Sequence, residues 1–574
     1  MRQALASHSP FMASHDPRLL SFINDYAACC DGDDLPATVL CGQGYHTTVP
    51  NGTVIRRTRD AMDYALALLE DGRVDSVARA LRIIPRVLAL QDREPCNRTF
   101  GIWPWFFEEP ISAMRPPDWN WADFIGVRLA HMLGRHADVL PGDLQTAMTD
   151  ALGDAALSIF RRNIGPDYTN IAVKGGVVAV MAGERLGRAF LVDYGRARLA
   201  RFLAHTRDNG GFTEYNSPPY GALVILEVER GLLLVKDPAT RDSLRAIHAL
   251  CWRGIANSLH PPTGQLCGPH ARAYDDTLSA THSELLGAEL GVPLFLPAGM
   301  PEPHERGRDI VNLLLIPRLP CPDDVRRDIL DAPRGRLVRQ DYVRSPDPEV
   351  RRQSTMWFDG DACLGSVNVE NLWQQRRPAV AYWKVGDTVA MLRVRLTHGG
   401  RDFASGVLRT AQAGPELLSV CSLVTNKADS HDHMDLPPDG VFRLDQLALC
   451  VELTAPDARV SGDAAAGYEL AAGDRTVAVR PSHAEFGGHP VAWEIRAEPG
   501  KASVRAVING GAPVALVPAQ MRNVAIGFRL ALQPPGEPLA APDVELADDA
   551  ITLTANGPHG PLAITSPRHP QLLR

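Results

Sequence analysis

The sequence lacks the features that mark several large classes of protein. No window of about 18 residues is continuously apolar and uncharged, so we expect no transmembrane helix. There is no dense run of lysine and arginine, and the formal net charge is −8. A chain without a basic patch is poorly suited to nucleic acid or to a membrane surface, and we expect neither as a partner.

Two further sequence patterns are lacking, the C-x-x-C pair and the apolar core of a signal segment. The ten cysteines form no C-x-x-C pair, which favours a reducing compartment over a disulfide framework. The first residues, MRQALASHSPFMASHDPRLL, contain no apolar core of signal-peptide length. As written, the sequence predicts a cytoplasmic protein. A chain whose signal segment had been removed would look the same and would be secreted.

The first half of the chain has a helical apolar pattern. At 574 residues the chain exceeds the usual size of one hydrophobic core, so at least two domains are expected. Asp75 is placed to cap one of the predicted helices. Since the helices are joined by short turns without a fixed repeat period, they favour a closed toroid over a regular solenoid. Apolar residues recur at spacings of three and four over residues 58–72, 74–90, 121–139, 142–162, 170–188, 190–206, 220–236, 239–258 and 279–290.

From about residue 335 the pattern changes to short runs rich in valine and threonine. Runs such as RTVAVRP and VAIGFRLAL alternate apolar with polar residues, which indicates half-buried antiparallel strands. A proline-rich stretch at 291–335, with a short helix expected at 323–331, connects the two patterns. We therefore predict a helical toroid over residues 1–320, a linker over 321–335 and an antiparallel β-sandwich over 336–574.

An aromatic stretch at 101–121, GIWPWFFEEPISAMRPPDWNW, contains Trp103, Trp105, Trp119 and Trp121. Flat aromatic faces beside carboxylates and an arginine suit stacking against sugar rings. Tryptophan is also usually buried, so these side chains could equally fill the core beneath a long loop. The first interpretation makes Trp103, Trp105 and Trp119 substrate-binding residues.

Three further segments place polar and aromatic side chains beside helix ends. The segment NGGFTEYNSPPYG at 209–221 is longer and more polar than a turn between helices needs. Asn170, at the start of a predicted helix, could be a simple N-cap, but three such clusters beside helix ends favour a site. The other candidates are Glu214, Tyr215, Asn216 and Tyr220 in the first segment, and His270, Arg272, Tyr274, Asp275 and Asp276 in GPHARAYDDT.

The order of these motifs resembles a known family. TNIA, GFTEYNSPPY, GPHARAYDD and LGSVNVENLWQQRRPAVAYW at 364–383 follow one another as in polysaccharide lyases of the helical-toroid type. That group includes the alginate and glucuronan lyases and the heparinase II/III-like enzymes. The resemblance covers about residues 95–440 and implies an incomplete (α/α) toroid joined to an antiparallel β-sandwich.

The resemblance also implies a reaction, β-elimination at a 4-linked uronic acid in an acidic polysaccharide or oligosaccharide. The proton next to a carboxylate is weakly acidic, so an enzyme must neutralise that carboxylate and stabilise the enolate-like intermediate. Asn170 and Arg272 are the implied neutralising groups. Glu214, Asn216 and His431 are expected to contact the substrate.

The acid and the base of this reaction are sought among tyrosine and histidine side chains. Tyr274 is the first candidate for the acid that protonates the leaving O4, since a nearby cation can shift a tyrosine towards working pH. Tyr220, Tyr215 and His270 are candidates for the base. Many toroid lyases have a histidine in the loop after the neutralising asparagine, and GFTEYNSPPY has none. The base therefore stays open.

A histidine pair at SHDHMD, residues 430–435, resembles the H-x-H segment of heparinase II-like and exo-alginate lyases. The resemblance implies that His431 approaches the substrate and that His433 helps to bind a structural zinc ion. His483, far downstream, could be a further ligand, because zinc takes three or four nitrogen, sulfur or oxygen ligands. No other cofactor is expected, and a solvent-exposed polar loop is the simpler alternative.

Two other functions fit the same residues. A glycoside hydrolase would need two carboxylates flanking the bond, and Glu214 with Asp275 or Asp276 could supply them. That alternative predicts a neutral sugar substrate. A non-catalytic carbohydrate-binding protein could use the same frame, since fold does not fix function. The density of acid and base candidates favours an enzyme.

Overall fold

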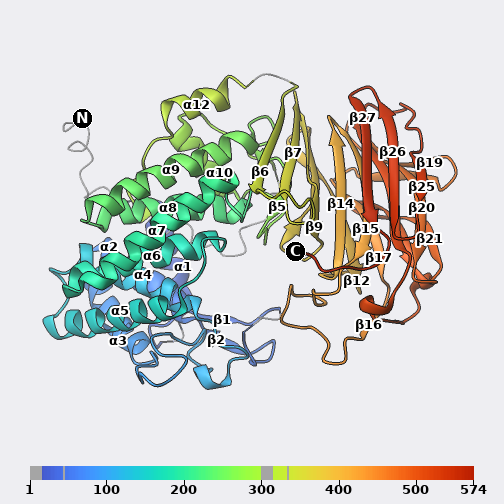
Figure 1. Cartoon of the computed structure of the whole chain (residues 1–574). Helices are drawn as coiled ribbons and strands as arrows, with labels where there is room; N and C mark the ends of the chain where they lie inside the picture. Colours follow the sequence, from blue (N-terminus) through green and yellow to red (C-terminus); the bar gives the residue numbers. More distant parts are fainter. Residues whose placement is uncertain (1–15, 31, 43–45, 299–313, 333–334) are drawn as a thin grey trace. The chain divides into compact units, whose positions relative to one another are not determined.

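The computed structural model describes residues 16–30, 32–42, 46–298, 314–332 and 335–574 (Figure 1). The chain splits into two compact units. The helical unit comprises Met1–His205, Ala222–Cys251 and Pro303–Pro320. The strand-rich unit comprises Thr206–Gly221, Trp252–Glu302 and Cys321–Arg574. Among the described helices, none has both the length and the apolar composition needed to cross a membrane.

The predicted helices are confirmed to within a few residues at each end. Asp75 is a correction, because Arg73 occupies the N-cap position and Asp75 lies in the first turn of α3. The helix α1 and the short pair of strands β1 and β2 were not predicted. The described helices are α1 (Pro17–Ala28), α2 (Thr58–Asp71), α3 (Val74–Leu88), α4 (Asn120–Arg135), α5 (Gly142–Arg162), α6 (Thr169–Leu186), α7 (Ala189–Asn209), α8 (Pro218–Leu234), α9 (Pro238–Ser258), α10 (Ala280–Leu290) and α12 (Asp323–Leu330).

Alternate helices of the helical unit form two layers. In one layer α2 packs on α4 and α4 packs on α6, and in the other α3 packs on α5. Lys174 of α6 reaches Glu227 of α8, with 2.7 Å between Nζ and Oε1, and so extends the first layer. The layers meet closely, since a Cβ atom added at Gly176 of α6 would lie 2.8 Å from Leu199 of α7. This alternation is the (α/α) arrangement.

The strand-rich unit contains two large antiparallel sheets and a small one. The first sheet has the order β21-β22-β17-β12-β11-β8-β7-β6 with β13 beside β12, the second β18-β19-β20-β24-β15-β14-β9, and the third β25-β26-β27. The remaining described strands form short pairs. The bounds are β1 (Ala37–Val39), β2 (Val54–Arg56), β3 (Leu259–His260), β4 (Gln265–Leu266), β5 (His270–Ala271), β6 (Leu337–Val343), β7 (Arg352–Asp359), β8 (Ala362–Val367), β9 (Val369–Asn371), β10 (Arg376–Arg377), β11 (Ala379–Val385), β12 (Thr388–His398), β13 (Arg401–Asp402), β14 (Gly406–Ala413), β15 (Glu416–Leu423), β16 (Phe442–Leu444), β17 (Ala448–Thr454), β18 (Arg459–Asp463), β19 (Gly467–Ala472), β20 (Arg475–Phe486), β21 (Val491–Glu498), β22 (Lys501–Ile508), β23 (Val514–Leu516), β24 (Val524–Gln533), β25 (Asp543–Leu546), β26 (Ala550–Gly557) and β27 (Gly560–Pro567).

The two large sheets bury one core between them. Leu392 of β12 and Leu417 of β15, from opposite sheets, belong to the same apolar cluster. Side chains alternate between the faces of a strand, so Leu418 of β15 points away from that core. It packs instead with Ile551 of β26, which makes the third sheet a further layer. The predicted fold class, an (α/α) helical part followed by an antiparallel β-sandwich, is confirmed, and the third layer was not predicted.

The change from helices to strands falls close to the predicted linker. The helix α12 lies within residues 321–335, and β6 begins at Leu337. The strand-rich unit nevertheless includes two earlier segments, Thr206–Gly221 and Trp252–Glu302. These segments carry most of the candidate site residues.

Candidate active site in the strand-rich unit

Backbone hydrogen bonds join three distant segments of the strand-rich unit. Strand β5 pairs antiparallel with β10, so that Ala271 lies opposite Arg376. The Ala271 N–H also donates to the Tyr215 carbonyl at 2.9 Å. The Ser217 hydroxyl donates to the Arg272 carbonyl at 3.0 Å. The segments 209–221, 268–277 and 372–377 are therefore held side by side.

Arg272 stands at the centre of this arrangement. Its φ of 57° lies in the left-handed region, which is uncommon for a residue with a side chain and which occurs often at functional sites. The guanidinium pairs with the Glu214 carboxylate, with 3.0 Å between Nε and Oε1. It also lies over two aromatic rings, 5.8 Å from the centroid of Tyr220 and 5.7 Å from that of Trp373. Arg272 is thus a cation framed by aromatic faces.

Tyr220 and Tyr274 meet beside Arg272. Their ring centroids are 6.0 Å apart in an edge-on contact, and Tyr274 is 45% exposed. Tyr220 lies in the first turn of α8, where its N–H donates to the Ser217 hydroxyl at 3.1 Å. Ser217 thereby caps a helix that opens with two prolines, which favour the first turn. The start of α8 fixes one tyrosine, and the segment after β5 presents the other.

Tyr215 and His270 lie in the interior. Tyr215 stacks on Tyr342 with centroids 4.3 Å apart and donates to the Glu370 carboxylate at 3.1 Å. Burial raises the pKa of Tyr215 well above its usual value. His270 is fully buried against the Tyr382 hydroxyl, and burial lowers the pKa of its imidazole to about 4. These two candidate bases are neutral and enclosed, so they belong to the scaffold of the site.

Asn216 also serves the scaffold. Its φ of 44° is left-handed, and its amide donates to the Tyr342 hydroxyl at 2.9 Å. Asparagine adopts this backbone conformation more readily than most residues. The turn at Asn216 separates the buried Tyr215 from the Ser217 cap that starts α8.

Trp373 is a site residue that the sequence analysis did not single out. Its ring lies below the Arg272 guanidinium and 5.1 Å from the ring of His431. The indole N–H has no acceptor among the described residues. A tryptophan followed closely by arginines in NLWQQRR was the available signal. Trp373 offers both an aromatic face and a hydrogen-bond donor.

The histidine pair at 431 and 433 has a defined geometry. The Nδ1 atom of His431 accepts backbone N–H groups from His433 and Met434, each at 3.2 Å. The proton of the neutral ring therefore sits on Nε2, and burial lowers the pKa of His431 to about 4. The side chain of His433 is 73% exposed. His483 lies in β20, 3.5 Å from Glu485.

The zinc site stays a prediction. Within the described ranges, no group of three or more metal-ligating side chains with closely spaced ligand atoms includes His431, His433 or His483. The Nδ1 atom of His431 is already occupied by backbone donors. A tetrahedral zinc site built on His433 and His483 would need at least one further ligand.

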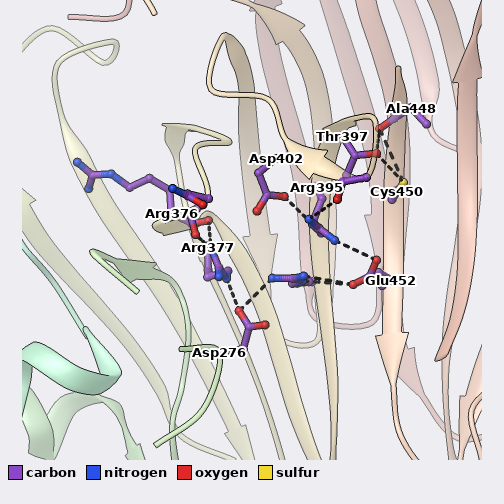
Figure 2. A network of polar contacts seen from close by, with 12 residues as sticks. Asp276, Arg376, Arg377, Arg395, Thr397, Asp402, Ala448, Cys450 and Glu452 are labelled. Atoms are coloured by element: carbon purple, nitrogen blue, oxygen red, sulfur yellow. Dashed lines mark hydrogen bonds and ion pairs between the residues drawn. The ribbon is translucent and has the colours of Figure 1, made fainter. Parts of the chain in front are cut away.

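Asp276 belongs to a network of charges that extends from β10 to strands β12 and β17 of the first sheet, as Figure 2 shows. Its Oδ1 atom lies 2.5 Å from Nε of Arg377 and 3.0 Å from Nη1 of Arg393. The network continues through Glu452 to Arg395. Burial acts to raise the pKa of Asp276, but the two arginines outweigh it and lower the pKa. An ionised, doubly paired carboxylate is unsuited to act as the general acid of a hydrolase.

Replacing Asp276 by Asn should destabilise the strand-rich unit by about 1–3 kcal/mol, because Arg377 and Arg393 would lose their shared counter-ion in a half-buried place. Urea unfolding followed by tryptophan fluorescence measures this change. Asp439→Asn is the matched control, since it breaks an exposed i,i+4 pair with Arg443 and should change stability little. If the two substitutions changed stability equally, Asp276 would not stabilise the unit through its pairing with Arg377 and Arg393.

The remaining candidates lie in the helical unit. Trp103 is fully buried and donates to the Val87 carbonyl at 3.0 Å, so it fills the core. Trp105 donates to Asp118 at 3.1 Å, and Trp119 donates to a backbone carbonyl. Asn170 is the second residue of α6, and the N-cap position belongs to the residue before the helix, so Asn170 is not the N-cap.

Comparisons with known proteins find a family model and distantly similar solved structures. Residues 42–289 match a family model described as a domain of unknown function, DUF8769. No curated protein matches the sequence. A chondroitin AC lyase from Streptomyces coelicolor A3, solved in complex with chondroitin sulphate, is similar with 9% identity and a TM-score of 0.45, over 99% of this chain and 96% of that one.

Two further solved structures are similar at lower TM-scores. A heparinase III gene product has 10% identity and a TM-score of 0.35, over 88% of this chain and 82% of that one. A mutant of the heparan sulfate lyase HepC from Pedobacter heparinus has 7% identity and a TM-score of 0.32, over 99% and 96%. Neither the fold nor the function of this chain is argued from likenesses at such values, and function depends on the residues of the site.

Proposed function

We propose that the protein is a polysaccharide or oligosaccharide lyase that cleaves a 4-linked, uronic-acid-containing glycan by β-elimination. The observation that carries this proposal is the cluster of Tyr220, Tyr274 and Arg272, in which two phenols lie beside one guanidinium. A uronate needs a cation for its carboxylate, and the elimination needs a base and an acid. The cluster offers all three.

The reaction divides among these residues as follows. Arg272 binds the uronate carboxylate through charge-assisted hydrogen bonds and stabilises the negative charge that develops on it. Tyr220, as phenolate, removes the proton from C5. The C4–O4 bond then breaks, a double bond forms between C4 and C5, and the Tyr274 hydroxyl gives its proton to O4. Proton exchange with water restores both tyrosines.

We assign the base to Tyr220 because the alternatives are enclosed. Tyr215 is 2% exposed and bound to Glu370, and His270 is fully buried against Tyr382. A base has to come within hydrogen-bond reach of the proton that it removes. Tyr274, at 45% exposed, is open to solvent and suits the role of the acid that meets a leaving chain.

Neighbouring groups would bind and orient the sugar. The face of Trp373 can stack against a sugar ring, and its indole N–H can donate to a hydroxyl. His431 presents an Nε2 donor next to that ring. Glu214 holds Arg272 in place. Asn170 stays the second neutralising group that the resemblance implies, and Asn170→Ala in the same assay tests it.

The hydrolase alternative loses support from the charge pairing. Asp276 is committed to Arg377 and Arg393, and Glu214 is committed to Arg272. A hydrolase would need one carboxyl group kept protonated by its surroundings, whereas these partners favour ionised carboxylates. Of the three carboxylates considered for a hydrolase, Asp275 would then be the one left, and hydrolysis needs two.

An ultraviolet absorbance time course with a panel of uronate polymers tests the proposal. Glucuronan, polymannuronate, polyguluronate and heparan-type chains are the substrates, because β-elimination leaves a conjugated double bond at the new non-reducing end. We expect absorbance to rise with at least one polymer. New reducing ends without absorbance would indicate a hydrolase, and an unaltered panel would favour a carbohydrate-binding protein.

A further inference from the structure

Two cysteines of the strand-rich unit lie together in one apolar cluster. Cys267 follows β4, and Cys363 lies in β8 opposite Phe358 of β7 and Tyr382 of β11. Both cysteines are fully buried in the same cluster. Cys363 and Gly365 lie two residues apart in β8, so they face the same side of the strand.

Glycine permits this close approach. A Cβ atom added at Gly365 of β8 would collide with the Gly268 carbonyl and lie 3.1 Å from the Cys267 sulfur. The Cys267 N–H donates to the Ser258 carbonyl at 2.6 Å, which fixes the backbone before the contact. The segment that enters β5 therefore runs directly against β8. Cys267 lies in that segment, and Cys363 lies in β8.

The two thiols have unequal environments. Burial acts to raise the pKa of Cys363, but the neighbouring Cys267 thiol and His260 imidazole outweigh it and lower the pKa below the usual value. Burial raises the pKa of Cys267. Burial also raises the pKa of the buried thiols of Cys251 and Cys421. Of these four buried thiols, Cys363 is the one suited to attack a disulfide.

We propose that Cys267 and Cys363 are a redox pair, whose disulfide ties the segment bearing Arg272 and Tyr274 to strand β8. The pairing goes beyond the proposed lyase reaction and does not depend on it. Arg272 and Tyr274 follow Cys267 within the same segment, and the pairing of β5 with β10 anchors the chain between Cys267 and Arg272. A covalent bond at Cys267 would fix the chain before β5 as well.

Oxidation balances with a small-molecule disulfide as the oxidant. The Cys363 thiolate attacks one sulfur of the small disulfide, which forms a mixed disulfide and releases one small thiolate. The Cys267 thiol then loses its proton and attacks the Cys363 sulfur, and the second small thiolate leaves. Two electrons pass from the protein thiols to the small disulfide, and the two thiol protons end on its released halves. Since both thiols are buried, the exchange requires local opening of the Cys267 segment.

Peptide mapping after oxidation tests the pair. The full-length protein is treated with excess oxidised glutathione, denatured, alkylated and digested with trypsin without reduction. Trypsin should release residues 254–272 and 353–376, each with a single cysteine. We expect these two peptides to be recovered linked, while Cys251 and Cys421 are alkylated. Recovery of both peptides fully alkylated, or of either one linked to another cysteine, would overturn the proposal.

A substitution and a second readout separate the pair from chance oxidation. In Cys267→Ala the attack should stop at the mixed disulfide, so Cys363 should retain glutathione. In the wild type, amide hydrogen exchange over residues 268–276 should slow after oxidation and return on reduction. Unchanged exchange in a protein whose disulfide has formed would overturn the tethering role. Neither readout uses catalytic activity.

Discussion

Arg272→Asn should lower kcat/KM on the cleaved uronate polymer by about 10²–10³-fold, the loss that follows removal of one group that stabilises a developing anion. The guanidinium lies between Tyr220 and Trp373 and is oriented by Glu214. Asn is the replacement of choice, because the φ of 57° at this position is left-handed and asparagine tolerates it. Initial rates of absorbance increase give the constants.

The Arg272 result needs controls for charge and for folding. Arg272→Lys keeps the positive charge and loses the planar fork, so its activity should fall between those of the wild type and Arg272→Asn. In Arg272→Asn the Glu214 carboxylate would lose its ion pair with Arg272, which would destabilise the fold. A double variant that also carries Glu214→Gln removes this carboxylate charge. If the double variant recovers wild-type activity, Arg272 supports the structure and does not neutralise the substrate.

Tyr274→Phe should lower kcat by about 10²–10⁴-fold with little change in KM, since general acid catalysis contributes that much. Phenylalanine keeps the ring that contacts Tyr220 at 6.0 Å between centroids, so the substitution removes only the hydroxyl. A substrate carrying a nitrophenolate leaving group at C4 needs no protonation as it departs. Its rate should therefore be nearly the same in the variant and the wild type.

Tyr468→Phe is the matched control for Tyr274→Phe. Tyr468 lies in β19 of the second sheet and packs against Trp493, so its hydroxyl should not affect kcat. If Tyr274→Phe loses activity equally on natural and activated substrates, Tyr274 is not the acid. Tyr220→Phe would then be the next variant, with loss on both substrates expected for the base.

The elements that sequence predicted best are those with strong local signals. The helix predicted at 142–162 coincides with α5, because an amphipathic pattern over several turns leaves little choice of structure. The strand run VAIGFRLAL became part of β24 for the same reason. The third sheet was missed because its place depends on both faces of β15 being buried, which a short apolar run does not reveal.

The candidate site was only partly predictable. The sequence identified Tyr220, Arg272 and Tyr274 through their loop positions, and the structure brings these three together. The sequence did not indicate that Tyr215 and His270 are buried, because adjacent loop residues of similar polarity can face opposite ways. The arginines that pair with Asp276 lie on β10 and β12, far along the chain, so no local sequence pattern indicated these ion pairs.

Product mass in heavy-oxygen water tests the central claim most directly. A uronate polymer that the protein cleaves is digested in such water, and the products are weighed at once by mass spectrometry. β-Elimination predicts new non-reducing ends that are lighter by one water than hydrolysis products, with no heavy oxygen at the new reducing ends beyond slow exchange. Saturated products carrying one heavy oxygen for each bond cleaved would contradict the lyase and return Glu214 and Asp275 to consideration.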